Sequence, residues 1–173
     1  MDKTKRQLSK LNFGCGNDVR SSWVNVDIKL GKGIDKSFDF NCFPYPFKDE
    51  SFGEIFSDNV LEHLENIPLV MKELHRIAKP GAKIRIIVPY YNCYGAYNDV
   101  THVHHFNEYA FEPFYKKDTR SNYFIKEKFE LEKLSLVPTR FGKLFLFDFL
   151  RKPLSKVLGQ IFQTIDLTLR VIK

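Results

Sequence analysis

The sequence has few cysteines, no long apolar run and no dense basic block beyond residues 3–6. Its three cysteines, Cys15, Cys42 and Cys93, lack metal-binding spacing and are odd in number, which favours reduced thiols and a cytoplasmic protein. No stretch of about 20 residues is apolar and free of charge, so we expect no membrane-spanning helix. The first residues also lack the apolar segment that a secretory leader needs.

Size and composition indicate one globular domain. The chain has 173 residues, 43% of them apolar, with 17 phenylalanines to fill a core. A net charge of +6 favours contact with anions such as nucleic acid, phosphorylated substrates or acidic membranes. The basic residues are scattered, however, which favours a solvated surface, and we do not expect nucleic acid as a partner.

Residues 11–27 have the pattern of a nucleotide-binding turn. An apolar run at 10–13 leads into Gly14-Cys15-Gly16, and a second apolar run at 23–26 ends in Asp27. Glycines let a ligand approach the backbone closely, and an acid at the end of the second strand can accept hydrogen bonds from a ribose diol. A complete strand–helix–strand unit needs about 30 residues, so the connection from Gly16 to Trp23 has room only for one helical turn or an irregular loop.

Alternating strand and helix signals favour a parallel α/β sheet over a sandwich. Further strands are expected over 37–40, 52–57 and 82–88, with a helix over 68–79 that Asn66 would cap. A short helix is expected over 107–116 and a two-stranded hairpin over 122–136. An amphipathic helix is expected after Pro153. The residues of its apolar face would be Leu154, Val157, Leu158, Ile161, Ile165, Leu169 and Ile172.

The chain resembles class I S-adenosylmethionine-dependent methyltransferases of the small, type 11-like methyltransferase-domain family. The resemblance covers roughly residues 9–115 and is carried by LNFGCGN (11–17), WVNVDI (23–28), FPYPFKDESFGEIFSDNVLEHL (43–64) and KPGAKIRIIVP (79–89). It implies a Rossmann-like α/β fold: a mostly parallel seven-stranded sheet with an antiparallel last strand and an abbreviated first crossover helix. The hairpin at 122–136 would supply the last two strands. Residues 1–140 would form the cofactor-binding domain, and residues 141–173 an apolar helical extension of it.

The resemblance also implies S-adenosylmethionine as cofactor. Asp27 would hold the ribose hydroxyls, Asp39 would accept from the adenine amino group, and Asp58 would face the sulfonium, whose positive charge favours a nearby carboxylate. Asn12 stands where the family usually has an acid, so any help it gives to the cofactor's amino group would come from an amide. The full set of implied cofactor contacts is Asn12, Gly14, Cys15, Gly16, Asn17, Asp27, Ile28, Asp39, Phe40, Asp58 and Asn59.

A polar loop follows the strand at 82–88 and contains Asp99, Thr101, His102, His104 and His105. Members of the family often show Asp-x-Thr-His here, and three interpretations stay open. His102 or His104 would act as a general base on an acceptor hydroxyl, oriented by Asp99, because imidazole titrates near neutrality. Alternatively, the three histidines and Asp99 would bind a metal, although no other cluster completes the coordination and our prediction includes no metal. In the third interpretation the loop is only a lid.

Two further features have an open role. Glu62-His63 is expected to cap or pack rather than to catalyse. Tyr90, Tyr91, Tyr94 and Tyr97 would line an acceptor pocket or lie on the surface.

The sequence as a whole predicts a cytoplasmic S-adenosylmethionine-dependent methyltransferase acting on a small molecule, with an oxygen of a sugar or glycan precursor as the acceptor. An RNA methyltransferase and a non-catalytic protein that keeps the fold are the alternatives. A nicotinamide-dependent dehydrogenase would need GxGxxG and a full crossover helix, and the chain has neither. The apolar residues of 141–173 would belong to the core, to a homodimer interface or to a peripheral membrane contact.

Overall fold

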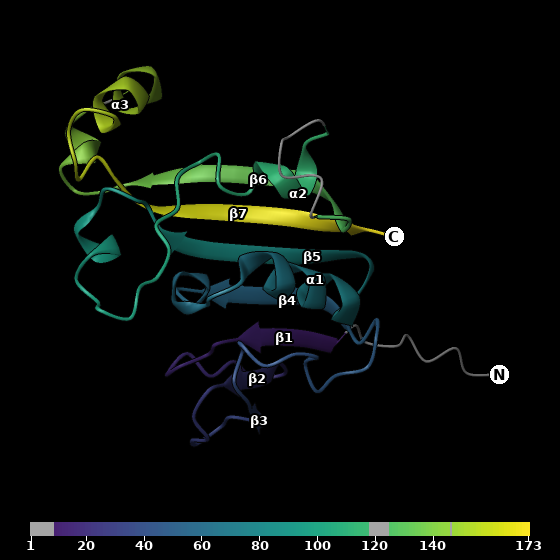
Figure 1. Ribbon diagram of the computed structural model, residues 1–173. Coiled ribbons are helices and arrows are strands. Elements are labelled where there is room, and N and C mark those ends of the chain that lie inside the picture. The colour runs from purple at the N-terminus through teal and green to yellow at the C-terminus, as the bar shows by residue number, and fades with distance from the viewer. Residues whose placement is uncertain (1–8, 118–124, 146) are drawn as a thin grey trace.

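Seven strands form one mixed sheet in the computed structural model, which describes residues 9–117, 125–145 and 147–173 (Figure 1). The strands are β1 (Ser9–Phe13), β2 (Val24–Asp27), β3 (Lys36–Ser37), β4 (Phe52–Asp58), β5 (Ala78–Pro89), β6 (Lys128–Pro138) and β7 (Phe162–Ile172). Their order across the sheet is β3-β2-β1-β4-β5-β7-β6. Strand β7 is antiparallel to both neighbours and the other pairings are parallel. This confirms the expected Rossmann-like fold with an antiparallel last strand.

In the described parts of the chain the helices are few and short. They are α1 (Ile67–Ile77), α2 (Glu112–Tyr115) and α3 (Asp148–Ser155), with turns of 3₁₀ helix at η1 (Leu61–His63), η2 (Tyr94–Ala96) and η4 (Gly142–Leu144). As expected, the side chain of Asn66 caps α1 by accepting a hydrogen bond from the backbone N–H of Leu69. None of the helices among the described residues is long and apolar enough to cross a membrane.

One face of the sheet is apolar and carries helices α1 and α2. Strand β5 alternates between fully buried Ile84 and Ile86 on this face and exposed Lys83 and Arg85 on the other. Helices α1 and α2 lie on the same side (Figure 1), since His75 of α1 and Phe114 of α2 both contact the ring of Phe129. The hydrophobic core therefore lies between these helices and the sheet.

The opposite face is covered by ion pairs. Lys10 pairs with Glu54, Lys83 pairs with Glu132, and Asp166 of β7 accepts from both Arg85 and Lys133. The guanidinium of Arg20 lies 3.7 Å from the centre of the Phe56 ring. These side chains cover the face of the sheet on which a helix between β1 and β2 would otherwise pack.

Two buried asparagines explain how the chain crosses from β1 to β2 without a helix. The amide of Asn12 donates to the backbone oxygen of Asp18 and to Asn25 Oδ1. The Asn25 side chain in turn accepts from the Arg20 N–H and donates to the backbone oxygens of Arg20 and Trp23. Side chains of β1 and β2 thus provide hydrogen-bond partners for the polar backbone of the connection. The first crossover therefore contains no helix.

The C-terminal third differs from the sequence prediction. The expected hairpin over 122–136 is wrong, because the only strand described there is β6 and its partner is β7 from the end of the chain; residues 122–124 lie outside the described part. The helix expected after Pro153 ends at Ser155, and residues 162–172 form β7. Ile165 and Leu169 misled the prediction because a spacing of four fits both a helix and a strand, whereas buried Leu167 fits only the strand. Residues 141–173 are therefore no helical extension, since β7 is an inner strand of the sheet.

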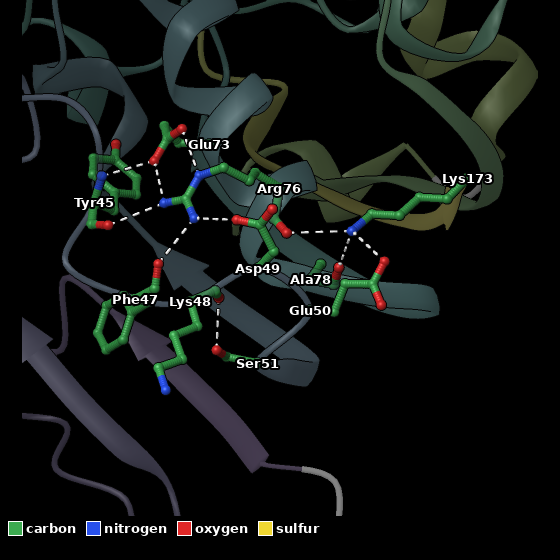
Figure 2. A network of polar contacts seen from close by, with 10 residues as sticks. All are labelled: Tyr45, Phe47, Lys48, Asp49, Glu50, Ser51, Glu73, Arg76, Ala78 and Lys173. Atoms are coloured by element: carbon green, nitrogen blue, oxygen red, sulfur yellow. Dashed lines mark hydrogen bonds and ion pairs between the residues drawn. The ribbon is translucent and has the colours of Figure 1, made fainter.

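A polar network fixes the long loop between β3 and β4 to α1. Arg76 donates to the carboxylates of Glu73 and Asp49 and to the backbone oxygens of Tyr45 and Phe47 (Figure 2). Glu73 also accepts from the Tyr45 backbone N–H. The Tyr45 hydroxyl then donates to the backbone oxygen of Phe40. The network thereby holds the segment that carries Asp39 and Phe40.

Candidate functional site

Two adjoining cavities lie beyond the carboxyl ends of β1, β2, β4 and β5, the edge at which open α/β sheets bind ligands. The first cavity has a volume of about 490 Å³. All of the cofactor contacts that the sequence implied are among its lining residues. These are Asn12, Gly14, Cys15, Gly16, Asn17, Asp27, Ile28, Asp39, Phe40, Asp58 and Asn59, joined by Asp18, Asn41, Phe56, Val60, His63 and Leu64.

The glycine turn forms the floor of the first cavity. The backbone N–H groups of Gly14 and Cys15 both donate to the oxygen of Val26, which holds the turn against β2. Gly14 has a φ of +72°, and a Cβ there would lie 2.2 Å from Val60. Gly16 has a φ of +48° and open space where its Cβ would be. Gly14 is therefore required by packing, while Gly16 leaves the backbone accessible to a ligand.

The rim of the first cavity combines two carboxylates with one apolar side chain. Asp27 ends β2, and its Oδ2 accepts from the Gly16 N–H at 2.7 Å. Ile28 beside it is 59% exposed, which leaves an apolar surface open for a flat ring. Asp39 accepts from the Asn41 N–H at 2.9 Å. Phe40, in contrast, is buried and stacks on Phe13, so it forms a wall of the cavity.

The inner end of the first cavity suits a ligand with positive charge. Asn12 uses both amide hydrogens on Asp18 and Asn25, which leaves its oxygen as the atom to present to a ligand. Burial raises the pKa of Asp58 at the tip of β4, and the nearby Arg20 opposes that shift. The lining holds four aspartates and no lysine or arginine. These residues fit the ammonium and sulfonium groups of S-adenosylmethionine.

Cys15 is part of this wall. Its side chain is buried, and burial together with the nearby Asp27 raises the pKa of the thiol. The thiol is thus protonated at neutral pH and unsuited to act as a nucleophile.

The second cavity, of about 320 Å³, adjoins the first and shares Asn59 and His63 with it. Its remaining lining residues are Glu62, Pro89, Gly95, Asn98, Asp99, His102, Gln163 and Thr164. The lining is thus rich in amide, hydroxyl, imidazole and carboxylate groups and contains no lysine or arginine. It suits a small polar molecule.

Glu62, His63 and His102 meet in the wall between the cavities. Glu62 is 1% exposed, and neither of its carboxylate oxygens has a hydrogen-bond partner among the described residues. Burial raises its pKa to about 7, with His102 acting in the opposite direction. The rings of His63 and His102 are 4.6 Å apart, and burial, followed by proximity to His102, lowers the pKa of His63. The expectation that Glu62-His63 only packs or caps did not include this long-range contact between His63 and His102.

The structure brings His102 and Asp99 to the second cavity, but it does not join them as predicted. The Asp99 carboxylate accepts from the backbone and hydroxyl of Thr101, so it does not orient the imidazole of His102. His102 Nδ1 instead lies 3.1 Å from the backbone oxygen of Ala96. The hydroxyl of Thr101 also contacts His63 Nδ1 at 2.8 Å. Asp99 is thus linked to His63 through Thr101.

The other two histidines of the loop lie elsewhere. His104 Nε2 contacts the backbone oxygen of Glu65, and the ring of His105 lies 4.3 Å from that of Tyr97. Neither residue lines the first or the second cavity. The prediction that His104 acts at the acceptor, and the metal site built on His102, His104 and His105, are therefore not supported by their positions. Tyr90, Tyr91, Tyr94 and Tyr97 also line neither cavity.

Comparison with known proteins agrees with this geometry. The family model described as "Methyltransferase domain" matches residues 11–86. Among solved structures, a protein from Bacillus halodurans has a TM-score of 0.65 at 15% identity, over 96% of this chain and 93% of that chain. The YcgJ protein from Bacillus subtilis gives a TM-score of 0.62 at 12% identity, over 96% and 92%. An S-adenosylmethionine-dependent methyltransferase from Mesorhizobium loti gives 0.57 at 14% identity, over 94% and 90%.

The structural likenesses, at these low identities, establish the fold. The family match spans residues 11–86 and so includes every residue that lines the first cavity, from Asn12 to Leu64. Residues 11–86 therefore match the methyltransferase-domain family, and the chain has the fold of the S-adenosylmethionine-dependent methyltransferases to which it is similar.

Proposed function

We propose that the protein transfers a methyl group from S-adenosylmethionine to a hydroxyl oxygen of a small polar molecule bound in the second cavity. The observation that carries this proposal is the junction of the two cavities at Asn59 and His63. A ligand in the second cavity lies next to the inner end of the first. Amide and hydroxyl groups of Asn98, Gln163 and Thr164 suit a sugar or glycan precursor, because each can pair with a hydroxyl group.

The residues of the first cavity would hold the cofactor as the family resemblance implies. Asp27 would accept hydrogen bonds from the ribose, Ile28 would cover the adenine, and Asp39 would accept from its amino group. The oxygen of Asn12 would accept from the ammonium group, and Asp58 would offset the charge of the sulfonium. When bound, S-adenosylmethionine would supply an activated methyl group for the acceptor oxygen and would leave as the neutral thioether, and the hydroxyl proton would pass to solvent.

The chain's own contribution to the reaction would be mainly positioning. Methyl transfer requires an in-line approach, and two cavities that share Asn59 and His63 would favour that alignment. Asn59 has a left-handed backbone (φ +52°), its N–H donates to the oxygen of Ile87, and its side chain donates to Asp58. These contacts fix the residue that stands between cofactor and acceptor.

A nucleic-acid acceptor is disfavoured by the charges around the site. A protein that binds RNA needs lysines and arginines on the path to the reacting atom. The two cavities hold none, and they expose several carboxylates. The surplus of positive charge lies elsewhere, partly in ion pairs on the far face of the sheet.

The test is methyl transfer from labelled S-adenosylmethionine to two panels, one of sugars and nucleotide sugars and one of bulk tRNA and rRNA. We expect label in a hydroxyl-bearing small molecule and none in RNA. Incorporation into RNA alone, with affinity that falls steeply with salt, would overturn the acceptor assignment.

The three free cysteines lead us to propose that the reaction takes place in the cytoplasm.

The segment between β6 and β7 provides a second proposal, a peripheral membrane contact. It extends away from the sheet around α3 (Figure 1), and Leu144, Phe147 and Phe149 are each more than half exposed. Lys143 and Lys152 lie in the same segment, as a surface for anionic lipid requires. Flotation with anionic vesicles at low salt tests it. Absence from the vesicle fraction, or a dimer in light scattering that Phe149→Ser abolishes, would contradict it.

A further inference from the structure

We propose that Glu62, His63 and His102 bind one divalent transition-metal cation of the Zn²⁺ or Co²⁺ class in the wall of the second cavity. One candidate ligand atom from each residue lies within 4.8 Å of the other two. Two imidazoles and a carboxylate form a donor set that such cations prefer. Ligands about 2.1 Å from a tetrahedral metal lie about 3.4 Å apart, so the three ligand atoms would have to move somewhat closer together on binding.

The carboxylate of Glu62 is the observation that calls for a ligand. Both its oxygens are buried without a hydrogen-bond partner among the described residues. Burying such a group is unfavourable unless it is paired or coordinates a metal. Nearby Asp58 and Asp99 add negative potential at the same place, so a cation would relieve repulsion as well as desolvation.

The hydrogen bonds of the two imidazoles leave one nitrogen of each ring available as a metal ligand. The Ala96 oxygen can only accept, so His102 Nδ1 donates to it and its Nε2 has a free lone pair. Thr101 donates its hydroxyl hydrogen to Asp99 and must therefore accept from His63 Nδ1. This leaves His63 Nε2 free too. Imidazoles fixed through one nitrogen by a carbonyl or a carboxylate relay are typical of metal centres.

The backbone holds the two halves of the site together. The backbone oxygen of Glu62 accepts from the N–H groups of Val103 and His104, at 2.8 Å and 3.2 Å. The loop that carries His102 is thereby joined to η1, which carries Glu62 and His63. The site is a property of this tertiary contact and not of spacing along the chain, which explains why the sequence predicted no metal.

The metal site would add a catalytic part to the proposed methyl transfer, and this role of the metal depends on the proposed function. Three protein ligands leave at least one coordination position open, as in catalytic metal sites. His63 borders both cavities, so an acceptor hydroxyl bound to the cation would lie next to the methyl donor. Coordination lowers the pKa of a bound hydroxyl, and its proton would pass to solvent. His102 would then serve as a ligand rather than as a general base.

The test is binding of Co²⁺ to the full chain after treatment with a chelator, followed by visible absorption and by metal analysis after dialysis. We expect one equivalent of Co²⁺ per chain, displaced by Zn²⁺. Glu62→Gln and His102→Ala should weaken binding at least 30-fold, and His104→Ala, the matched control from the same loop, should leave it unchanged. Failure of the wild type to hold stoichiometric metal, or equal loss in His104→Ala, would overturn the proposal.

A second readout guards against variants that fail to fold. In chelator, Glu62→Gln should be at least as thermostable as the wild type, because it removes an unpaired buried charge. With Zn²⁺ at 100 times the Kd, the wild-type Tm should rise by about 5 °C or more and that of Glu62→Gln should not. A Glu62→Gln variant that is less stable in chelator, with no metal response in either protein, would show a structural role and refute the site. Binding of S-adenosylhomocysteine without metal is expected, so loss of the metal site leaves the methyltransferase proposal testable.

Discussion

The two cavities differ in how far apart along the chain their residues lie. The first is lined by residues from Asn12 to Leu64, which come from successive strand ends. The second draws its lining from Asn59 to Thr164, including a loop after β5 and the start of β7. A ligand site built from neighbouring strand ends is visible in a short sequence motif, whereas one built by distant loops becomes visible only in the folded chain.

Among the variants that distinguish the two cavities, Asp27→Ala is expected to have the largest effect, a loss of cofactor affinity. It removes the carboxylate proposed to bind the ribose, and the loss of charge-assisted hydrogen bonds should weaken S-adenosylhomocysteine binding about 100-fold. Calorimetric titration measures the effect, with Co²⁺ binding as the control that should not change. An unaltered affinity would remove the first cavity from cofactor binding.

Gly14→Ala should be the next largest change, and it acts on the floor of the first cavity. Its Cβ would lie 2.2 Å from Val60 on a backbone with φ of +72°, and the clash and strain together should cost about 2–3 kcal/mol of unfolding free energy. Urea denaturation checks this value. The double variant with Val60→Ala should recover only the part due to the clash, so full recovery or none would contradict the two-part cause.

Low pH is expected to reduce the free energy of unfolding through Glu73, whose contacts hold a wall of the first cavity in place. Burial raises the pKa of Glu73, but hydrogen bonds from Arg76 and the Tyr45 N–H outweigh burial and hold the pKa below its ordinary 4.5. A lowered pKa gives stability that is complete above the ordinary value and lost as the pH falls through the folded value. Glu73→Gln should therefore be about 2 kcal/mol less stable than wild type at pH 7. Urea unfolding at pH 7, 5, 4 and 3 should show this gap shrinking below about pH 4, and a constant gap would contradict the assignment.

The smallest expected effect belongs to Asp99→Asn, which acts on the second cavity only. Through Thr101, Asp99 positions His63, and loss of such an outer partner typically weakens metal affinity about 10-fold. Co²⁺ titration should show that loss while the affinity for S-adenosylhomocysteine stays within about twofold. A larger change in cofactor affinity than in metal affinity would mean that the two cavities are not separable.

Much of the fold could be predicted because its signals are local. Gly14, Gly16 and Asp27 mark β1 and β2, and Asn66 marks the start of α1, all within a few residues of the element they specify. Strand β7 was missed because Ile165 and Leu169 fit a helix as well as a strand. Its assignment depends on pairing with β5 and β6, which is a long-range contact.

In the candidate site, too, local features could be predicted and long-range contacts could not. The order of glycines and aspartates places the first cavity, but nothing near Glu62 in the sequence shows that His102 will lie against it. The histidine spacing of 102, 104 and 105 suggested a set that the structure does not bring together, because His104 contacts the backbone oxygen of Glu65 and His105 packs on Tyr97. Only the contact between η1 and the loop from Val103 selects His63 and His102.

The most direct test of the account is a crystal structure with S-adenosylhomocysteine. We predict the adenosyl group between Asp27, Ile28 and Asp39, with the sulfur at Asp58 and Asn59 facing the second cavity. Density outside the first cavity, or a sulfur atom directed away from His63 and His102, would contradict it.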